Sequence, residues 1–162
     1  HFRHHEVVGA RMTKKILKEL KYDNKTIKDI SLLVEQHLRP HTFKMGWTDS
    51  AVRRYIVDAG HMLEDLNQLV RADVTTKNKT KAKEIYDNLD EMEKRIEEVK
   101  AKEELSKIRP ALSGDEIMKH FNIQPGPKVG VIMKALYEQR INDGEVSKEE
   151  ALQLAEETFK NL

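Results

Sequence analysis

Three side chains that could bind a metal ion lie at the ends of apolar helical stripes in this sequence. His5 precedes one stripe by three residues, His37 follows another by three, and Asp73 comes three residues after a valine and four after a leucine. Residues at these spacings share one face of a helix, so all three side chains are expected on inner faces. Neutral imidazole nitrogen and carboxylate oxygen are suitable ligands for several divalent metals.

Burial of these groups without partners is costly, and a metal ion is only one way to offset that cost. Each histidine could instead be held by a hydrogen bond, and Asp73 could face outward to cap a helix or pair with Lys or Arg. Residue spacing alone leaves both interpretations open.

The composition predicts an all-α fold. The chain has 162 residues, of which 38% are hydrophobic, 35% charged and 6% aromatic. This balance is typical of a protein rich in charged helices, and the alternation expected of strands is scarce. The length suits one domain, with or without a small appendage.

The absence of cysteine excludes a disulfide framework and a thiolate metal site, and it favours a cytoplasmic location. No apolar stretch approaches the ~18 residues needed to cross a bilayer, and the start has no apolar core of a secretory signal. We therefore expect no membrane partner.

The net charge of +1 conceals an asymmetry along the chain. Residues 1–83 contain 17 Lys and Arg against 10 Asp and Glu, a net charge of +7, and the remainder has a net charge of −6. A basic first half suits a polyanionic partner, although an ordinary solvated surface could have the same charge.

Helical periodicity divides the chain into three segments. The first is a helical cluster over residues 1–76, and Asn24 is the expected N-cap of its second helix. The opening helix of this cluster has an apolar face formed by Val8, Met12, Ile16 and Leu20.

The second segment is a long connecting helix over residues 77–108, which contain neither Gly nor Pro. Its narrow apolar seam is formed by Ile85, Leu89, Met92, Ile96 and Val99. The third segment, residues 109–162, is a small helical tail module in which Ser113 and Glu116, and again Ser147 and Glu150, have the spacing of a capping box.

Several motifs together resemble one known family. HHEVVGARM, LVEQHLR, WTDSAVRRYIVDAG and LVRADVTTKNK resemble the second half of the HD-type domain in bacterial CCA-adding tRNA nucleotidyltransferases, notably those of the actinobacterial type. LSGDEIMKHFNIQPGPKVGVIMKALYEQRINDG resembles the tail module of the same tRNA nucleotidyltransferase and poly(A) polymerase family. The motifs occur in the family's order and cover nearly the whole chain.

The resemblance implies that His5, His37 and Asp73 correspond to three ligands of the divalent-metal site in HD-type domains. The family's first histidine and its His-Asp doublet have no counterpart in this sequence. We therefore expect an incomplete metal site and no cofactor in this chain, with a divalent metal such as magnesium in the parent enzyme.

The family's polymerising domain has a Gly-Ser motif and paired aspartates that hold metal ions for nucleotidyl transfer, and nothing in this sequence resembles it. We expect the chain alone to be inactive as a transferase, whatever the parent catalyses. The resemblance implies that such C-terminal modules bind tRNA while the polymerase head acts on its 3′ end.

Basic residues are the first candidates for RNA contact, because Lys and Arg neutralise phosphates with little sequence preference. Lysines gather at the start of the long helix, and arginines lie in neighbouring segments of the basic half. A second candidate is the QPGPKVG turn, where the first N–H groups of a helix could face an anion. The predicted RNA-binding residues are Arg39, Arg53, Arg54, Lys77, Lys79, Lys81, Lys83, Arg109, Gly126 and Lys128.

Two other functions compete with tRNA binding. One is a metal-dependent phosphohydrolase of the HD type, against which the missing His-Asp doublet counts. The other is a helical protein-interaction module that forms a homodimer through the apolar seam of the long helix.

Overall fold

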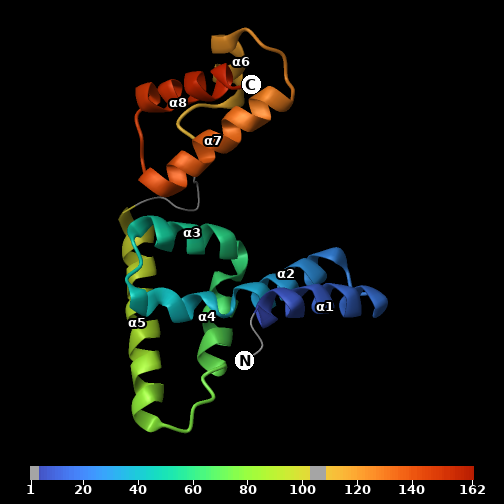
Figure 1. Ribbon diagram of the computed structural model, residues 1–162, viewed down its shortest axis with the longest axis vertical. Helices are drawn as coiled ribbons and strands as arrows, with labels where there is room; N and C mark the ends of the chain where they lie inside the picture. The colour runs from blue at the N-terminus through green and yellow to red at the C-terminus, as the bar shows by residue number, and fades with distance from the viewer. Residues whose placement is uncertain (1–3, 103–108) are drawn as a thin grey trace. The chain divides into compact units, whose positions relative to one another are not determined.

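The computed structural model describes residues 4–102 and 109–162, except for the side chain of Met45, and in these ranges it contains helices and no strands (Figure 1). The expected all-α class is confirmed. The α-helices are α1 (His5–Glu19), α2 (Asn24–Gln36), α3 (Asp49–Ala59), α4 (Leu63–Ala72), α5 (Lys79–Lys102), α6 (Gly114–Phe121), α7 (Pro127–Asp143) and α8 (Lys148–Lys160). The 3-10 helices are η1 (Arg39–Met45) and η2 (Gly60–Met62).

The chain folds into two compact units. Unit 1 comprises His1–Thr48 and Tyr55–Glu98, and unit 2 comprises Asp49–Arg54 and Val99–Leu162. None of the described helices is both long enough and apolar enough to cross a bilayer.

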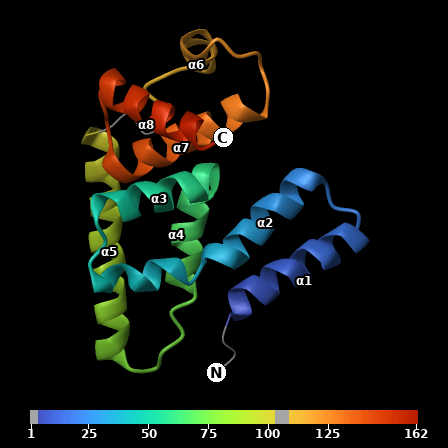
Figure 2. The same ribbon diagram turned by 45° about the horizontal axis from the view of Figure 1, so that its top comes forward.

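In unit 1, α1 and α2 form an antiparallel hairpin (Figures 1 and 2). A Cβ atom added at Gly9 would lie 3.1 Å from Cγ1 of Val34, so the two helices approach closely at this point. The N-cap of α2 is Asp23 rather than the expected Asn24, because the Thr26 amide donates to Asp23 Oδ1 at 3.0 Å.

The structure corrects the expected inner face of α1. The predicted apolar stripe, which runs from Val8 through Met12 and Ile16 to Leu20, is 48–64% exposed. The buried residue of α1 is Ala10, next to the close approach at Gly9. The predicted stripe is therefore not the buried face of α1.

The rest of unit 1 is held by α4 and α5. Leu66 and Val70 of α4 are fully buried, and Arg71 donates to Glu93 at 2.7 and 3.1 Å and to Asp90 at 2.6 Å. These two carboxylates raise the pKa of the Arg71 guanidinium, which therefore stays charged.

Most of the apolar seam of α5 is buried by packing within the chain. Leu89, Met92, Ile96 and Val99 are at most 2% exposed. This burial corrects the alternative in which the seam forms a dimer surface. The helix begins at Lys79, two residues after the expected start, and the expected stretch 103–108 lies outside the described residues.

Unit 2 has a core of its own between α6, α7 and α8. Phe121 and Phe159 stack with their ring centroids 4.5 Å apart. Both expected capping boxes are present, at Ser113 and Ser147. The buried core residues are Leu112, Ile117, Ile132, Leu136, Ala151 and Ala155.

Candidate nucleic-acid interface

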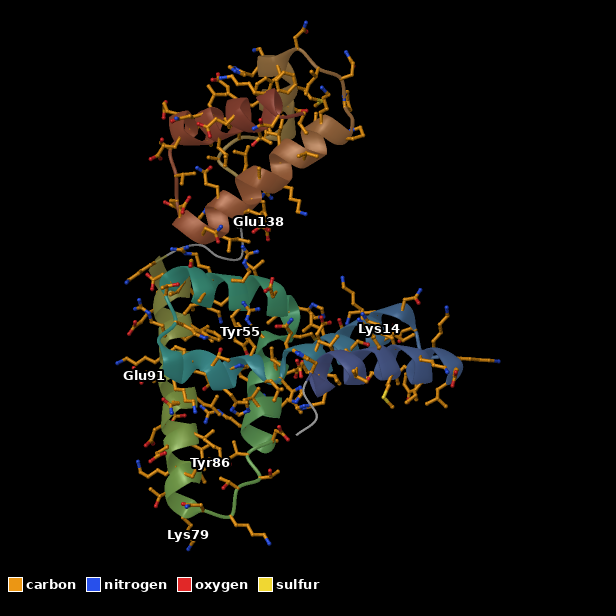
Figure 3. The ribbon with its side chains drawn as sticks, viewed as in Figure 1. Lys14, Tyr55, Lys79, Tyr86, Glu91 and Glu138 are labelled. Carbon is orange, nitrogen blue, oxygen red and sulfur yellow. The ribbon has the colours of Figure 1, made fainter. Side chains whose placement is uncertain are left out.

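A basic cluster lies at the start of α5. Lys77, Lys79 and Lys81 are exposed, and none of them forms an ion pair with another described residue. Asn78 begins the helix by accepting from the Lys81 amide at 3.1 Å. Figure 3 shows Lys79 at the end of the helix, pointing away from the rest of unit 1.

Lys83, one turn further along, is in a different situation. Its Nζ lies 2.7 Å from Asp87 Oδ2, and this contact raises the pKa of the lysine. Of these four lysines, only Lys83 is paired with a carboxylate of a described residue, and the first three could meet a phosphate without that competition.

Arg39 is held by contacts inside unit 1. Its guanidinium donates to Asp58 at 2.6 Å, and it lies over the rings of Trp47 and Tyr55 at 6.0 and 5.7 Å from their centroids. Tyr55 is fully buried and donates its hydroxyl to Asn67 at 2.8 Å. Burial raises the pKa of this phenol, so Tyr55 stays neutral.

Arg53 and Arg54 are held by contacts inside unit 2. Arg53 is 7% exposed and donates to the carbonyl oxygens of Ile141 and Asn142, at 2.5 and 3.0 Å. Arg54 forms a two-pronged contact with the carboxylate of Glu138 and holds the pKa of that group below its usual value. These two arginines bind the C-terminal part of α7 to the first turns of α3.

The expected anion site at the start of α7 is exposed. Gly126 is the N-cap residue, no side chain caps the helix, and Pro127 occupies its first turn. Lys128 is exposed, with its Nζ 5.3 Å from the centroid of the Phe159 ring. Arg109 is also exposed.

The backbone conformation at Gly126 does not require a glycine. Its φ of 173° is extended, and an added Cβ would meet its nearest neighbour, the Gln124 carbonyl oxygen, at an ordinary 3.8 Å. A glycine at this position is not required by the fold of unit 2, which is compatible with close approach of a ligand to the backbone.

Two of the three predicted metal ligands lie side by side. The rings of His5 and His37 are 5.6 Å apart between centroids. His37 ends α2, and its Nδ1–H donates to the Val34 carbonyl at 2.7 Å, which leaves the lone pair of the neutral ring on Nε2.

His41, which was not among the predicted ligands, lies near enough to Asp73 and His37 for both to influence its pKa. Burial lowers the pKa of His41, the nearby Asp73 carboxylate opposes that shift, and His37 adds to it. His41 follows His37 by four residues, a spacing that would place both on one face of a regular α-helix. Pro40 and the 3-10 helix that begins at Arg39 interrupt the α-helix, so the spacing alone did not indicate this.

These donors do not fit a complete metal site. Within residues 4–102 and 109–162, no group of three His, Cys, Asp or Glu side chains converges so as to hold a metal ion. Asp73 is exposed at the C-terminal end of α4.

The described residues define an all-helical protein with an exposed lysine cluster at the start of α5 and two neighbouring histidine rings. Residues 7–155 match the family described as tRNA nucleotidyltransferase domain 2. The chain belongs to this family, and the resemblance noted in the sequence is confirmed.

Two curated relatives support the assignment. The chain is 30% identical to an A-adding tRNA nucleotidyltransferase of Deinococcus radiodurans over 86% of its own length, and 31% identical to a CC-adding tRNA nucleotidyltransferase of Thermus thermophilus over 91%. In both cases the matched region spans 31% of the relative. No solved structure matches the chain significantly.

Proposed function

We propose that this chain is a tRNA-binding portion of a tRNA nucleotidyltransferase that extends the 3′ end of tRNA. Family membership and the names of both relatives support this proposal. Because tRNA is the proposed partner, the cytoplasm is the proposed compartment.

The observation that carries the proposal is the lysine cluster at the start of α5. Exposed ammonium groups without carboxylate partners can neutralise phosphates and release counterions at little cost. A-form RNA is recognised mainly through its shape and backbone. A cluster that contacts phosphates therefore suits recognition of a folded RNA better than recognition of a particular base sequence.

The entry to α7 is the proposed second contact. No side chain caps the first turn of α7, whose N–H groups favour an anion, and Lys128 of the same turn is exposed. Arg39, Arg53 and Arg54 were also predicted to contact RNA. We propose that they support RNA binding only indirectly, because they hold helices in place through contacts within the protein.

We propose that the chain alone transfers no nucleotides. It matches only 31% of each relative, and the nucleotidyl-transfer motif expected of the family has no counterpart in its sequence. The incomplete set of donors around His5 and His37 likewise gives no support to a phosphohydrolase activity.

The test is a titration of labelled tRNA with the chain at two salt concentrations. We expect binding that weakens with salt, and we expect replacement of Lys77, Lys79 and Lys81 by Glu to abolish most of it. Loss of three phosphate contacts should reduce the slope of log K against log salt by about two to three.

The matched control changes the same charge elsewhere. Lys119, Lys134 and Lys160 are exposed lysines of unit 2 outside both proposed contacts, and their replacement by Glu should leave most of the affinity intact. Equal loss in both triple variants would mean that net charge alone drives binding and would contradict the assignment to α5.

A further inference from the structure

A groove in unit 1 is not used by the proposed phosphate contacts. It lies between one face of α5 and the residues Phe43, Lys44, Gly46 and Trp47, and its volume is about 450 Å³. In both ribbon views the segment that follows α2 runs up to the middle of α5 (Figures 1 and 2). Pockets that hold small ligands begin at about this size.

One wall of the groove is aromatic and fixed. Phe43 and Trp47 meet edge to face, with their ring centroids 5.7 Å apart. The indole Nε1–H donates to Thr42 at 3.0 Å, and Trp47 also contacts the buried ring of Tyr55. Such a wall offers a rigid apolar surface to a flat ring.

The opposite wall is polar and comes from one stripe of α5. Asn88 and Glu91 line it, one turn apart. The Asn88 amide donates one hydrogen to the Glu84 carbonyl, which leaves its oxygen and a second N–H for another partner. Glu91 is exposed and forms no ion pair with any described residue (Figure 3).

Two lysines complete the groove. Lys44 on the first wall and Lys94 on the second are both exposed, and neither forms an ion pair within the described ranges. Arg95, by contrast, is already bound to Glu98 at 2.8 Å. The groove therefore combines two available cations with carboxylate and amide acceptors beside an aromatic wall.

We propose that this groove binds one unpaired nucleotide of the RNA that the chain holds. The nucleobase would lie against Phe43 and Trp47, its amino and ring N–H groups would donate to Glu91 and Asn88, and the phosphate would meet Lys44 or Lys94. A phosphate ion would be repelled by the Glu91 carboxylate. A base-paired nucleotide has its Watson–Crick edge occupied, so its N–H groups on that edge could not donate to Glu91 and Asn88. This inference rests on the proposed function.

The single tryptophan of the sequence makes the groove directly observable. The probes are AMP, CMP, GMP and UMP, each titrated against the labelled chain while the one indole N–H signal is followed by NMR. We expect at least one nucleotide to shift this signal saturably, whereas inorganic phosphate and a blunt RNA duplex leave it in place.

Substitutions separate groove binding from general attraction. Lys94→Ala and Asn88→Ala should each weaken nucleotide binding by about threefold to tenfold, the value of one lost hydrogen bond. Lys14→Ala removes an exposed lysine of the same unit on α1, outside the groove, and should have no effect (Figure 3). A response to phosphate alone, no response to any nucleotide, or equal affinities in all three variants would overturn the inference.

The tRNA titration distinguishes this failure from failure of the proposed function. If tRNA binds through the α5 lysines but no nucleotide reaches Trp47, the groove assignment is wrong and the proposed function stands. If the chain does not bind tRNA, the proposed function is wrong and the nucleotide loses its assignment to a bound RNA.

Discussion

At the scale of single residues, charge identified the candidates and packing separated them. The sequence placed three arginines and four lysines together as phosphate contacts because all of them are basic. Arg39, Arg53 and Arg54 instead meet partners 19 to 89 residues away in the chain. Such long-range contacts leave no local pattern in the sequence, whereas a run of lysines at a helix start is a local feature, and its contact with RNA stays a prediction.

The first prediction concerns Arg53. Its replacement by Ala should destabilise the protein by about 2–3 kcal/mol, because the two carbonyl oxygens of α7 would lose a buried charged donor. Unfolding in urea measures the loss. Lys81→Ala, an exposed change on α5, should stay within about 0.5 kcal/mol, and equal stabilities of the two variants would show that the Arg53 contacts add nothing.

The second prediction concerns the carboxylate of Glu116 in the capping box of α6. Lys148 at 2.7 Å, together with Ser113, lowers the pKa of Glu116 from 4.5 to about 2. A lowered pKa in the folded protein means that the charged group stabilises the fold above pH 4.5 and that this stabilisation is lost as the pH falls towards 2. The melting temperature of the wild type should therefore exceed that of Glu116→Gln at pH 7, with the gap closing at acid pH.

Glu150→Gln is the matched control for this experiment. Glu150 has the same capping role at Ser147, but hydrogen bonds from Ser147 alone lower its pKa, without a lysine partner. Its gap to the wild type should be smaller at pH 7. A gap at Glu116 that is constant from pH 7 to acid pH would show that the Lys148 contact carries no pH-dependent stability.

At the scale of elements, periodicity predicted the helices and missed one of their faces. The capping boxes and the long α5 were predictable because Ser-x-x-Glu spacing and a run without Gly or Pro act locally. The apolar stripe of α1 faces solvent in this chain, although its periodicity is that of a core face. Periodicity shows that a helix has an apolar side, but it cannot show what covers that side.

The third prediction tests the contact between α1 and α2. Gly9→Leu should destabilise the protein by about 1–3 kcal/mol, because the new side chain would start 3.1 Å from Val34 and force the helices apart. Thermal unfolding followed by circular dichroism measures the change. Gly130→Ala should instead stabilise the protein. An added Cβ at Gly130 has no neighbour within 4 Å, and alanine is more favourable than glycine inside a helix such as α7. If both changes stabilise, α1 and α2 are not held at this distance.

At the scale of the whole molecule, the chain spans only 31% of the length of each relative it matches. The resemblance to one family was visible in the order of the motifs, and residues 7–155 confirm it. The two compact units could not be predicted from the sequence, because each of them consists of two separate stretches of the chain. Residues 49–54 of unit 2 lie between the two stretches of unit 1. Tests on the chain itself are therefore needed to separate tRNA binding, which we propose for it, from nucleotide transfer, which we do not.

The fourth prediction follows from this division of labour. If the chain binds tRNA without extending it, it should compete with a complete enzyme for the same substrate. Added to the A-adding tRNA nucleotidyltransferase of Deinococcus radiodurans, it should raise the apparent KM for tRNA, whereas kcat and the KM for ATP stay constant. The variant with Lys77, Lys79 and Lys81 replaced by Glu should not inhibit. Incorporation of ATP or CTP into tRNA by the chain alone would contradict the proposal, since nucleotide transfer would then need nothing beyond these 162 residues.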